Sequence, residues 1–169
     1  MRAVRLLLDA AGIYVVDAKG IVVAHETAGK RVTGMDISFR PYWQEAMRGR
    51  AVVYPALGVE TAERGLYVSA PIHSRVSADS PAIGAIVVKT GADDLDRKLA
   101  MVGREVMLVS PQGVVFAATD KAWLLRLTSE ASGERLEEIR RIRQFGDAIG
   151  KAQAPSALPF DLSGETVGF

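Results

Sequence analysis

The sequence has no cysteine and only two histidines among its 169 residues. The absence of cysteine excludes thiol nucleophiles, disulfides, thiolate zinc sites and iron–sulfur clusters. His25 and His73 lie far apart, and neither belongs to an HExxH or HxxxH pattern. We therefore expect no metal and no cofactor.

An excess of one charge and a long apolar run are missing as well. The 21 basic and 20 acidic residues leave a formal net charge of +1, which provides no field for nucleic acid or a membrane surface. The longest apolar stretch, 82–88, has seven residues, whereas a spanning helix needs about 20. The opening MRAVRLLLDAAG is interrupted by Asp9 and makes a poor signal peptide. We expect a soluble globular chain that meets a membrane only through segments outside it.

Motifs of common enzyme chemistry are also lacking. There is no GxxxxGK[ST] loop, no GxGxxG and no GxSxG elbow. The adjacent carboxylates Asp93 and Asp94 are better explained as partners of amides and dipole in the first turn of a helix. The run 134–143 mixes charges of both signs, as a solvated helix face does. We predict no catalytic residue and no enzyme.

A repeated pattern is present instead. Residues 13–24 (IYVVDAKGIVVA) and 106–117 (VMLVSPQGVVFA) each contain an apolar run, a polar link, a glycine and a second apolar run. Such β-branched runs around a turn glycine predict β-hairpins. The match has two interpretations: a chance similarity between common hairpins, or a tandem of two related modules.

The segments around the first hairpin predict an α+β module. LLLDAA ends a helix before the hairpin, and YWQEAMR (42–48) forms a short helix closed by Gly49. A helix over 93–102 has a buried stripe of Leu95, Leu99 and Val102. Three further strands are expected at 51–57, 65–73 and 82–89. This order predicts a PAS-like antiparallel sheet of five strands flanked by helices.

The remaining residues predict a second, shorter module. After its hairpin comes a helix over 133–143 and then a stretch with prolines, and the sequence stops at Phe169. That is too early for three more strands. We expect one module over 1–103 and an incomplete second PAS-like module over 104–169.

One group of residues indicates anion binding. Arg40 precedes Pro41, which suits the first position of a helix, and a guanidinium beside helical amides can hold a carboxylate. Lys89 ends an apolar strand, and Tyr67 shares a strand face with Ser69. The alternative is structural: a local salt bridge for Arg40, a solvent-seeking strand end for Lys89 and a core position for Tyr67.

SFRPYW, ALGVETAERGLYVSAPI and IGAIVVK together resemble a known family. They are similar to the double Cache extracytoplasmic sensor domain of bacterial histidine kinases that detect four-carbon dicarboxylates. That domain has two PAS-like modules after a long helix. The likeness extends through REVMLVSPQGVVFAATDKAW and RIRQFGDAI, and so covers about 12–149.

Matched by position, this resemblance implies carboxylate contacts from an arginine and a serine, a second cation, a hydroxyl, a tyrosine and nearby backbone amides. The implied ligand-binding residues are Ser38, Phe39, Arg40, Gly58, Thr61, Tyr67 and Lys89. The loop 59–64 is expected to close over the anion.

The sequence departs from the family pattern at several positions. Val59 and Glu60 stand where small hydroxyl residues are usual, Leu66 replaces the first of two tyrosines, and His25 with Glu26 replaces a small polar pair. A carboxylate facing the pocket would repel a dianion and favour a monocarboxylate or an amine-bearing ligand.

The resemblance implies the periplasmic sensory domain of a transmembrane receptor, a small carboxylate ligand and a possible homodimer. Two alternatives stay open. One is an orphan interaction or dimerisation module without ligand, and the other is a cytoplasmic PAS-type regulator.

Overall fold

The computed structural model describes residues 1–27, 29, 31–59, 61–75 and 80–146. The helices are α1 (Arg2–Leu7), α2 (Pro41–Met47), α3 (Asp93–Ala100) and α4 (Gly133–Arg141), with a 3₁₀ turn η1 (Lys121–Trp123). The strands are β1 (Gly12–Asp17), β2 (Val22–Thr27), β3 (Val52–Leu57), β4 (Arg64–His73), β5 (Ala82–Gly91), β6 (Met107–Val109) and β7 (Val115–Ala118).

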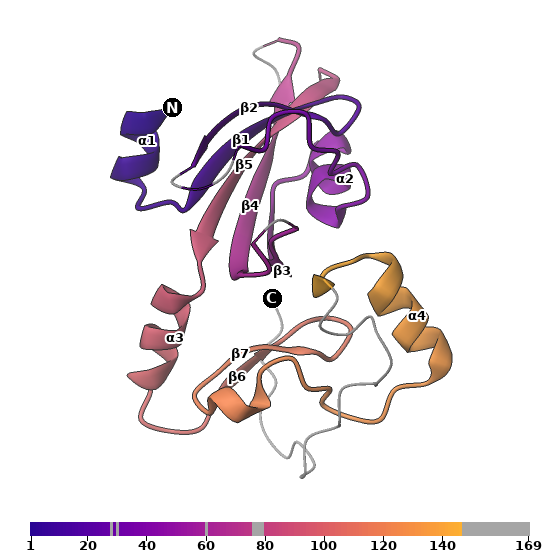
Figure 1. The fold of residues 1–169 in the computed structure, drawn as a ribbon. Helices are drawn as coiled ribbons and strands as arrows, with labels where there is room; N and C mark the ends of the chain where they lie inside the picture. The colour runs from indigo at the N-terminus through magenta and orange to yellow at the C-terminus, as the bar shows by residue number, and fades with distance from the viewer. Residues whose placement is uncertain (28, 30, 60, 76–79, 147–169) are drawn as a thin grey trace.

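Five strands form an antiparallel sheet in the order β2-β1-β5-β4-β3, which confirms the predicted fold. Gly20 closes the β1–β2 hairpin with φ +86°, a conformation that glycine adopts without a steric penalty. The last strand, β5, returns between β1 and β4. Helix α2 covers one face of this sheet (Figure 1), and the core between them includes Val16, Tyr42 and Val87. We call β1–β5 with α2 the large-sheet unit.

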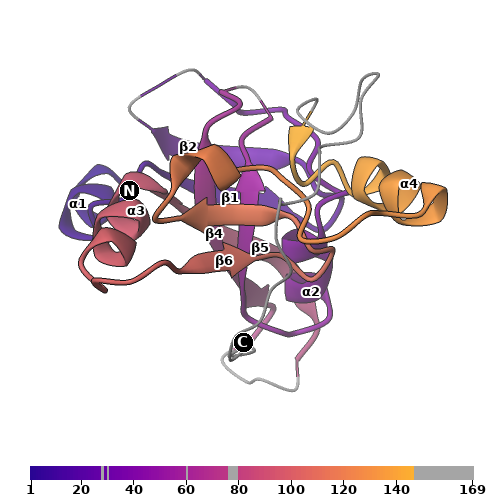
Figure 2. The same ribbon diagram turned by 90° about the horizontal axis from the view of Figure 1, so that it is seen from below.

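Helix α3 leads from β5 to a second, two-stranded sheet of β6 and β7. The turn of this hairpin contains Gly113 at φ +76°, as the repeat predicts. Ser132 caps α4 by accepting a hydrogen bond from the Arg135 amide at 3.3 Å. Both views show α4 on the same side of the molecule as α2 (Figures 1 and 2). We call β6, β7, η1, α4 and the residues after α4 up to 146 the small-sheet unit; the expected proline stretch lies outside the described residues.

Two details of α3 differ from expectation. The helix ends at Ala100, so Val102 lies beyond it and is 48% exposed. Leu95 and Leu99 pack against the hydrophobic cluster that includes Phe116. Among the described residues, no side chain caps the first amides of α3. Asp94 instead pairs with Arg97 and Lys98. These i+3 and i+4 partners compete successfully for its carboxylate.

Candidate functional site

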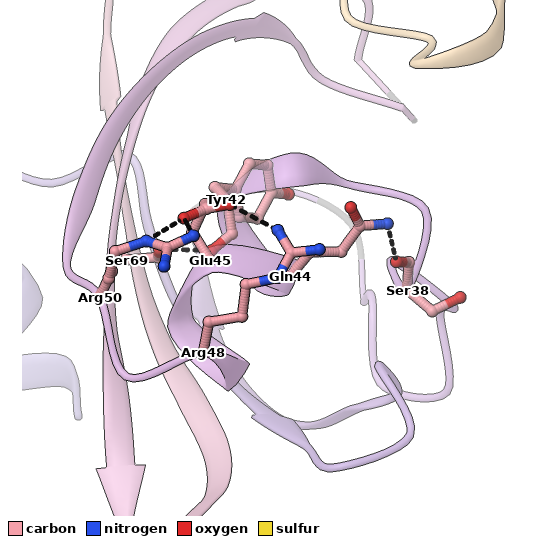
Figure 3. Close-up of polar contacts among 7 residues, drawn as sticks. All are labelled: Ser38, Tyr42, Gln44, Glu45, Arg48, Arg50 and Ser69. Atoms are coloured by element: carbon pink, nitrogen blue, oxygen red, sulfur yellow. Dashed lines mark hydrogen bonds and ion pairs between the residues drawn. The ribbon is translucent and has the colours of Figure 1, made fainter.

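Side-chain hydrogen bonds and ion pairs fix α2 to its neighbouring segments (Figure 3). The buried Ser69 hydroxyl of β4 donates to the Tyr42 carbonyl at 2.7 Å. Gln44 donates to the Ser38 carbonyl at 3.1 Å and so ties the helix to the loop before it. Glu45 pairs with both Arg48 and Arg50 at the far end of the helix. The bond from Ser69 therefore holds the start of α2, where Arg40 lies, against β4.

A cavity of about 50 Å³ lies between this face of the sheet and the segments around α2. One wall is apolar and another is aromatic, and the polar groups come from the α2 entrance, the β3–β4 loop and the end of β5. The lining residues are Tyr14, Val22, Val32, Met35, Ile37, Arg40, Tyr42, Gly58, Val59, Thr61, Tyr67 and Lys89.

Lys89 provides the cation at the β5 end of the cavity and is 6% exposed. Its Nζ donates to Thr61 Oγ1 at 3.3 Å and lies 3.6 Å from a carboxylate oxygen of Glu63, whose side chain is mostly exposed. A Cβ on Gly58 would come within 2.5 Å of Thr61 Oγ1, 3.3 Å of Tyr67 Oη and 3.4 Å of Lys89 Nζ. Glycine therefore lets the loop backbone approach these three polar groups closely.

Arg40 provides the second cation and is 2% exposed. It is the N-cap residue of α2, and Pro41 follows it as the first residue of the helix, as predicted. Its Nη1 donates to the Arg143 carbonyl and its Nη2 to the Leu57 carbonyl, both at 2.8 Å. Among the described residues its buried Nε has no partner. The guanidinium is thus held by neutral carbonyls, and the structure contains no ion pair for it among those residues.

Three tyrosines lie close together along the cavity. The Tyr42 and Tyr67 rings stack with centroids 5.1 Å apart and planes 5° apart. Burial raises the pKa of Tyr42 and of Tyr67 well above the ordinary value near 10. Burial also raises the pKa of Tyr14. Their hydroxyls stay neutral at physiological pH and can donate hydrogen bonds.

The structure brings five of the seven expected site residues to the cavity: Arg40, Gly58, Thr61, Tyr67 and Lys89. Ser38 and Phe39 lie elsewhere. Ser38 packs over Gly20, and a Cβ added to Gly20 would collide with the backbone of Ser38. The Phe39 ring lies beneath the guanidinium groups of Arg40 and Arg143 and lines a separate crevice.

Backbone amides contribute less than expected. The Gly58 amide donates to the Glu63 carbonyl at 2.9 Å and closes the β3–β4 loop on itself. This intraloop bond occupies the N–H that the resemblance made available for a ligand.

Several lining residues were missed in the sequence. Tyr14 shares a strand face with Val16, and alternation alone could have indicated its direction. Tyr42 lies in the SFRPYW segment that carries the resemblance, but nothing in the sequence marks it as a cavity residue. Val32 and Met35 come from a loop whose course depends on tertiary contacts, so no local signal identifies them.

The residues that depart from the family pattern lie in different parts of the fold. Val59 lines the cavity, whereas Glu60 lies outside the described residues. The Glu26 carboxylate lies 3.7 Å from Arg5, and His25 Nδ1 lies 2.8 Å from Thr33 Oγ1. Neither His25 nor Glu26 lines the cavity.

A five-stranded antiparallel sheet with a small cavity on one face, followed by a second sheet, is a PAS-like fold of the kind found in Cache ligand-binding domains. The chain is homologous to C4-dicarboxylate sensor proteins. It is 29% identical over 150 residues to the C4-dicarboxylate transport sensor protein DctB of Rhizobium meliloti, a match over 88% of this chain and 24% of that protein. DctB of Pseudomonas aeruginosa is 29% identical over 104 residues, or 62% of this chain and 16% of that protein.

Solved structures agree with this relationship. The sensor domain of the Vibrio cholerae histidine kinase DctB matches with a TM-score of 0.75 and 26% identity, over 91% of this chain and 57% of that one. The ligand-binding domain of the Campylobacter jejuni chemoreceptor Tlp3, solved with 4-methylisoleucine, has the same fold, with a TM-score of 0.57 and 24% identity over 76% and 51% of the two chains. No family model matches.

The chain thus spans about a quarter or less of the curated relatives that it matches. No helix in the described part of the chain is both long and apolar enough to cross a membrane.

Proposed function

We propose that this chain is the extracytoplasmic ligand-binding part of a bacterial transmembrane receptor and that it binds a small carboxylate of the C4-dicarboxylate type. The observation that carries the proposal is the pair of buried cations, Arg40 and Lys89, on one cavity. The proposed site also includes Gly58, Thr61 and Tyr67.

The chemistry of these groups favours an anion with two acceptor ends. Buried cations are costly unless an opposite charge or several acceptors neutralise them. Among the described residues, Lys89 pairs with the mostly exposed Glu63 carboxylate and donates to the Thr61 hydroxyl, and Arg40 donates to two neutral carbonyls. A ligand carboxylate would provide Arg40 with a counter-ion and Lys89 with one less exposed to solvent than Glu63, and neutral Tyr67 could donate a further hydrogen bond.

We further propose that residues 1–103 bind the ligand and that the following residues pass the signal on. A ligand changes a conformational equilibrium only when it binds the two states unequally. The β3–β4 loop, which carries Gly58, Val59 and Thr61, is the segment whose closure would make such unequal contacts.

The test is thermal unfolding with succinate, malate, fumarate, malonate, acetate, lactate and several amino acids. At a hundred times its dissociation constant, a ligand stabilises the native state by about 2.7 kcal/mol, a rise of about 5–10 °C for a chain of this size. We expect a C4-dicarboxylate to give such a rise and Lys89→Met to lose it. Lys98→Met, which changes a mostly exposed lysine of α3, is the matched control and keeps the rise.

Other results would contradict the proposal. If no carboxylate stabilises a sample that melts cooperatively, the chain is an orphan interaction module. If Lys89→Met retains the full rise, the ligand binds elsewhere. If only an amino acid stabilises the chain and Lys89→Met loses that rise, the ligand class is wrong although the site is right.

A further inference from the structure

Arg40 connects the cavity with the small-sheet unit. It lines the cavity, yet its Nη1 donates to the carbonyl of Arg143, just after α4. We infer that Gln144, which lies outside the cavity, sets the ligand affinity of the cavity by holding the Arg143 carbonyl against Arg40. The inference rests on the proposed function and adds the regulation of that site.

Gln144 holds the segment that follows α4 against β3 through two hydrogen bonds. Its Nε2 donates to the Pro55 carbonyl at 2.6 Å, and its own carbonyl accepts from the Leu57 amide at 2.8 Å. Gln144 is fully buried. The next residue after Leu57 is Gly58, which lines the cavity. The two hydrogen bonds of Gln144 therefore lie directly beside the proposed site.

The Arg143 and Leu57 carbonyls compete with a ligand for Arg40. Each accepts one N–H of the guanidinium at 2.8 Å. An ionised carboxylate is the stronger acceptor and takes two N–H groups of arginine side by side. A ligand that draws the guanidinium towards the cavity therefore weakens its contact with Arg143.

Competition of this kind couples the two units in both directions. If the ligand loosens the contact between Arg143 and Arg40, then loosening the contact first must strengthen ligand binding by the same factor. The side chain of Gln144 is the place to loosen it, because it contacts Pro55 and not the cavity lining. Gln144 is thus a positioning residue that acts through Arg143.

The experiment measures succinate binding by isothermal titration calorimetry to the whole chain and to Gln144→Met. Methionine keeps the length of the side chain and removes both the donor to Pro55 and the buried Oε1, which has no partner among the described residues. We expect about two- to tenfold tighter binding, the range for one neutral hydrogen bond.

The control is Thr128→Val, which removes the hydrogen bond from the Thr128 hydroxyl to the Gly113 carbonyl within the small-sheet unit. It leaves the junction with β3 untouched, so we expect wild-type affinity. A general loosening of the small-sheet unit would affect both variants alike.

Hydrogen exchange of the Leu57 amide gives a second readout that a merely structural role would not move. Succinate should speed its exchange in the wild-type chain, because the bond to Gln144 opens as Arg40 turns to the ligand. Unchanged or weaker binding by a folded Gln144→Met, or slower Leu57 exchange with succinate, would overturn the inference and leave the proposed function intact. If wild type does not bind succinate, the proposed dicarboxylate function fails as well.

Discussion

At the scale of single residues, the two buried cations of the cavity differ in how well their polar partners satisfy them. Both N–H₂ groups of Arg40 have carbonyl partners in the fold, so the guanidinium can stay buried without a ligand. Among the described residues, Lys89 has one long hydrogen bond and an ion pair with the mostly exposed Glu63. Lys89 therefore gains more from an added anion, whereas Arg40 must give up existing bonds.

Gly58 is the residue on which the shape of the cavity depends most directly. In Gly58→Ala the added methyl group would come within 2.5 Å of Thr61 Oγ1 and would crowd Lys89 and Tyr67. We expect about tenfold weaker succinate binding, measured by calorimetry, and an unfolding free energy lower by about 1 kcal/mol. Gly91→Ala is the control, because nothing lies within 4 Å of its added Cβ. Equal affinities for wild type and Gly58→Ala would mean that the loop does not contact the ligand.

The tyrosines predict a loss of stability at high pH. Burial raises the pKa of Tyr67 in the folded state, so the unfolded chain releases this proton first. The stabilisation is complete below pH 10, the ordinary pKa, and is lost as pH rises from there through the folded pKa. Burial likewise raises the pKa of Tyr54, to about 12.

This effect is measured as the midpoint of thermal unfolding between pH 8 and pH 11.5. Tyr67→Phe removes one such proton, so its midpoint should fall less steeply above pH 10 than that of wild type. Parallel curves would mean that Tyr67 ionises freely in the folded chain.

At the scale of elements, Arg64 of the large-sheet unit links that unit to α3 by an ion pair and to the small-sheet unit by a hydrogen bond. Arg64 of β4 donates to both carboxylate oxygens of Asp96, at 3.1 and 2.7 Å, and to the Phe116 carbonyl of β7 at 3.0 Å. The paired side chains are 18% and 13% exposed. Because limited exposure reduces solvent screening, this pair contributes more to the free energy of unfolding than a surface pair does.

Asp96→Asn removes the charge of this pair and keeps its size. We expect the unfolding free energy to fall by about 1–2 kcal/mol in urea denaturation, because Arg64 is left without its counter-ion. Asp94→Asn, on the same helix, is the control: its partners Arg97 and Lys98 are mostly exposed, and its cost should stay within about 0.5 kcal/mol. Similar losses of unfolding free energy in both variants would show that the Arg64–Asp96 pair stabilises the fold no more than a surface pair does.

The elements that could be predicted from the sequence are those with local causes. Alternating apolar runs and turn glycines such as Gly20 and Gly113 identify both hairpins, and Pro41 marks the start of α2. The cavity was only partly predictable. The position of Arg40 before Pro41 indicates its place at the start of α2. Its carbonyl partner Arg143 lies 103 positions away, and such a contact arises only when the two units pack together.

At the scale of the whole molecule, the two units share one hydrophobic cluster. Leu57 of the large-sheet unit packs there with Phe116, Ile139 and Phe145. The junction also contains the hydrogen bonds of Arg40 with Arg143 and of Leu57 with Gln144 described above. Separating the units would expose this cluster and leave buried polar groups without partners.

We therefore expect the two units to unfold together, and the two tryptophans can report it. Trp43 packs against the core of the large-sheet unit and donates to the Asp17 carbonyl at 3.1 Å, and Trp123 is buried in the small-sheet unit. In urea, the fluorescence of Trp123→Phe follows Trp43, and that of Trp43→Phe follows Trp123. Each fluorescence midpoint should coincide with that of far-ultraviolet circular dichroism for the same variant, as in a two-state transition. A Trp123 signal that changes at lower urea than the circular dichroism of the same variant would mean that the small-sheet unit opens first, and that its contacts with Arg40 are too weak to connect the units.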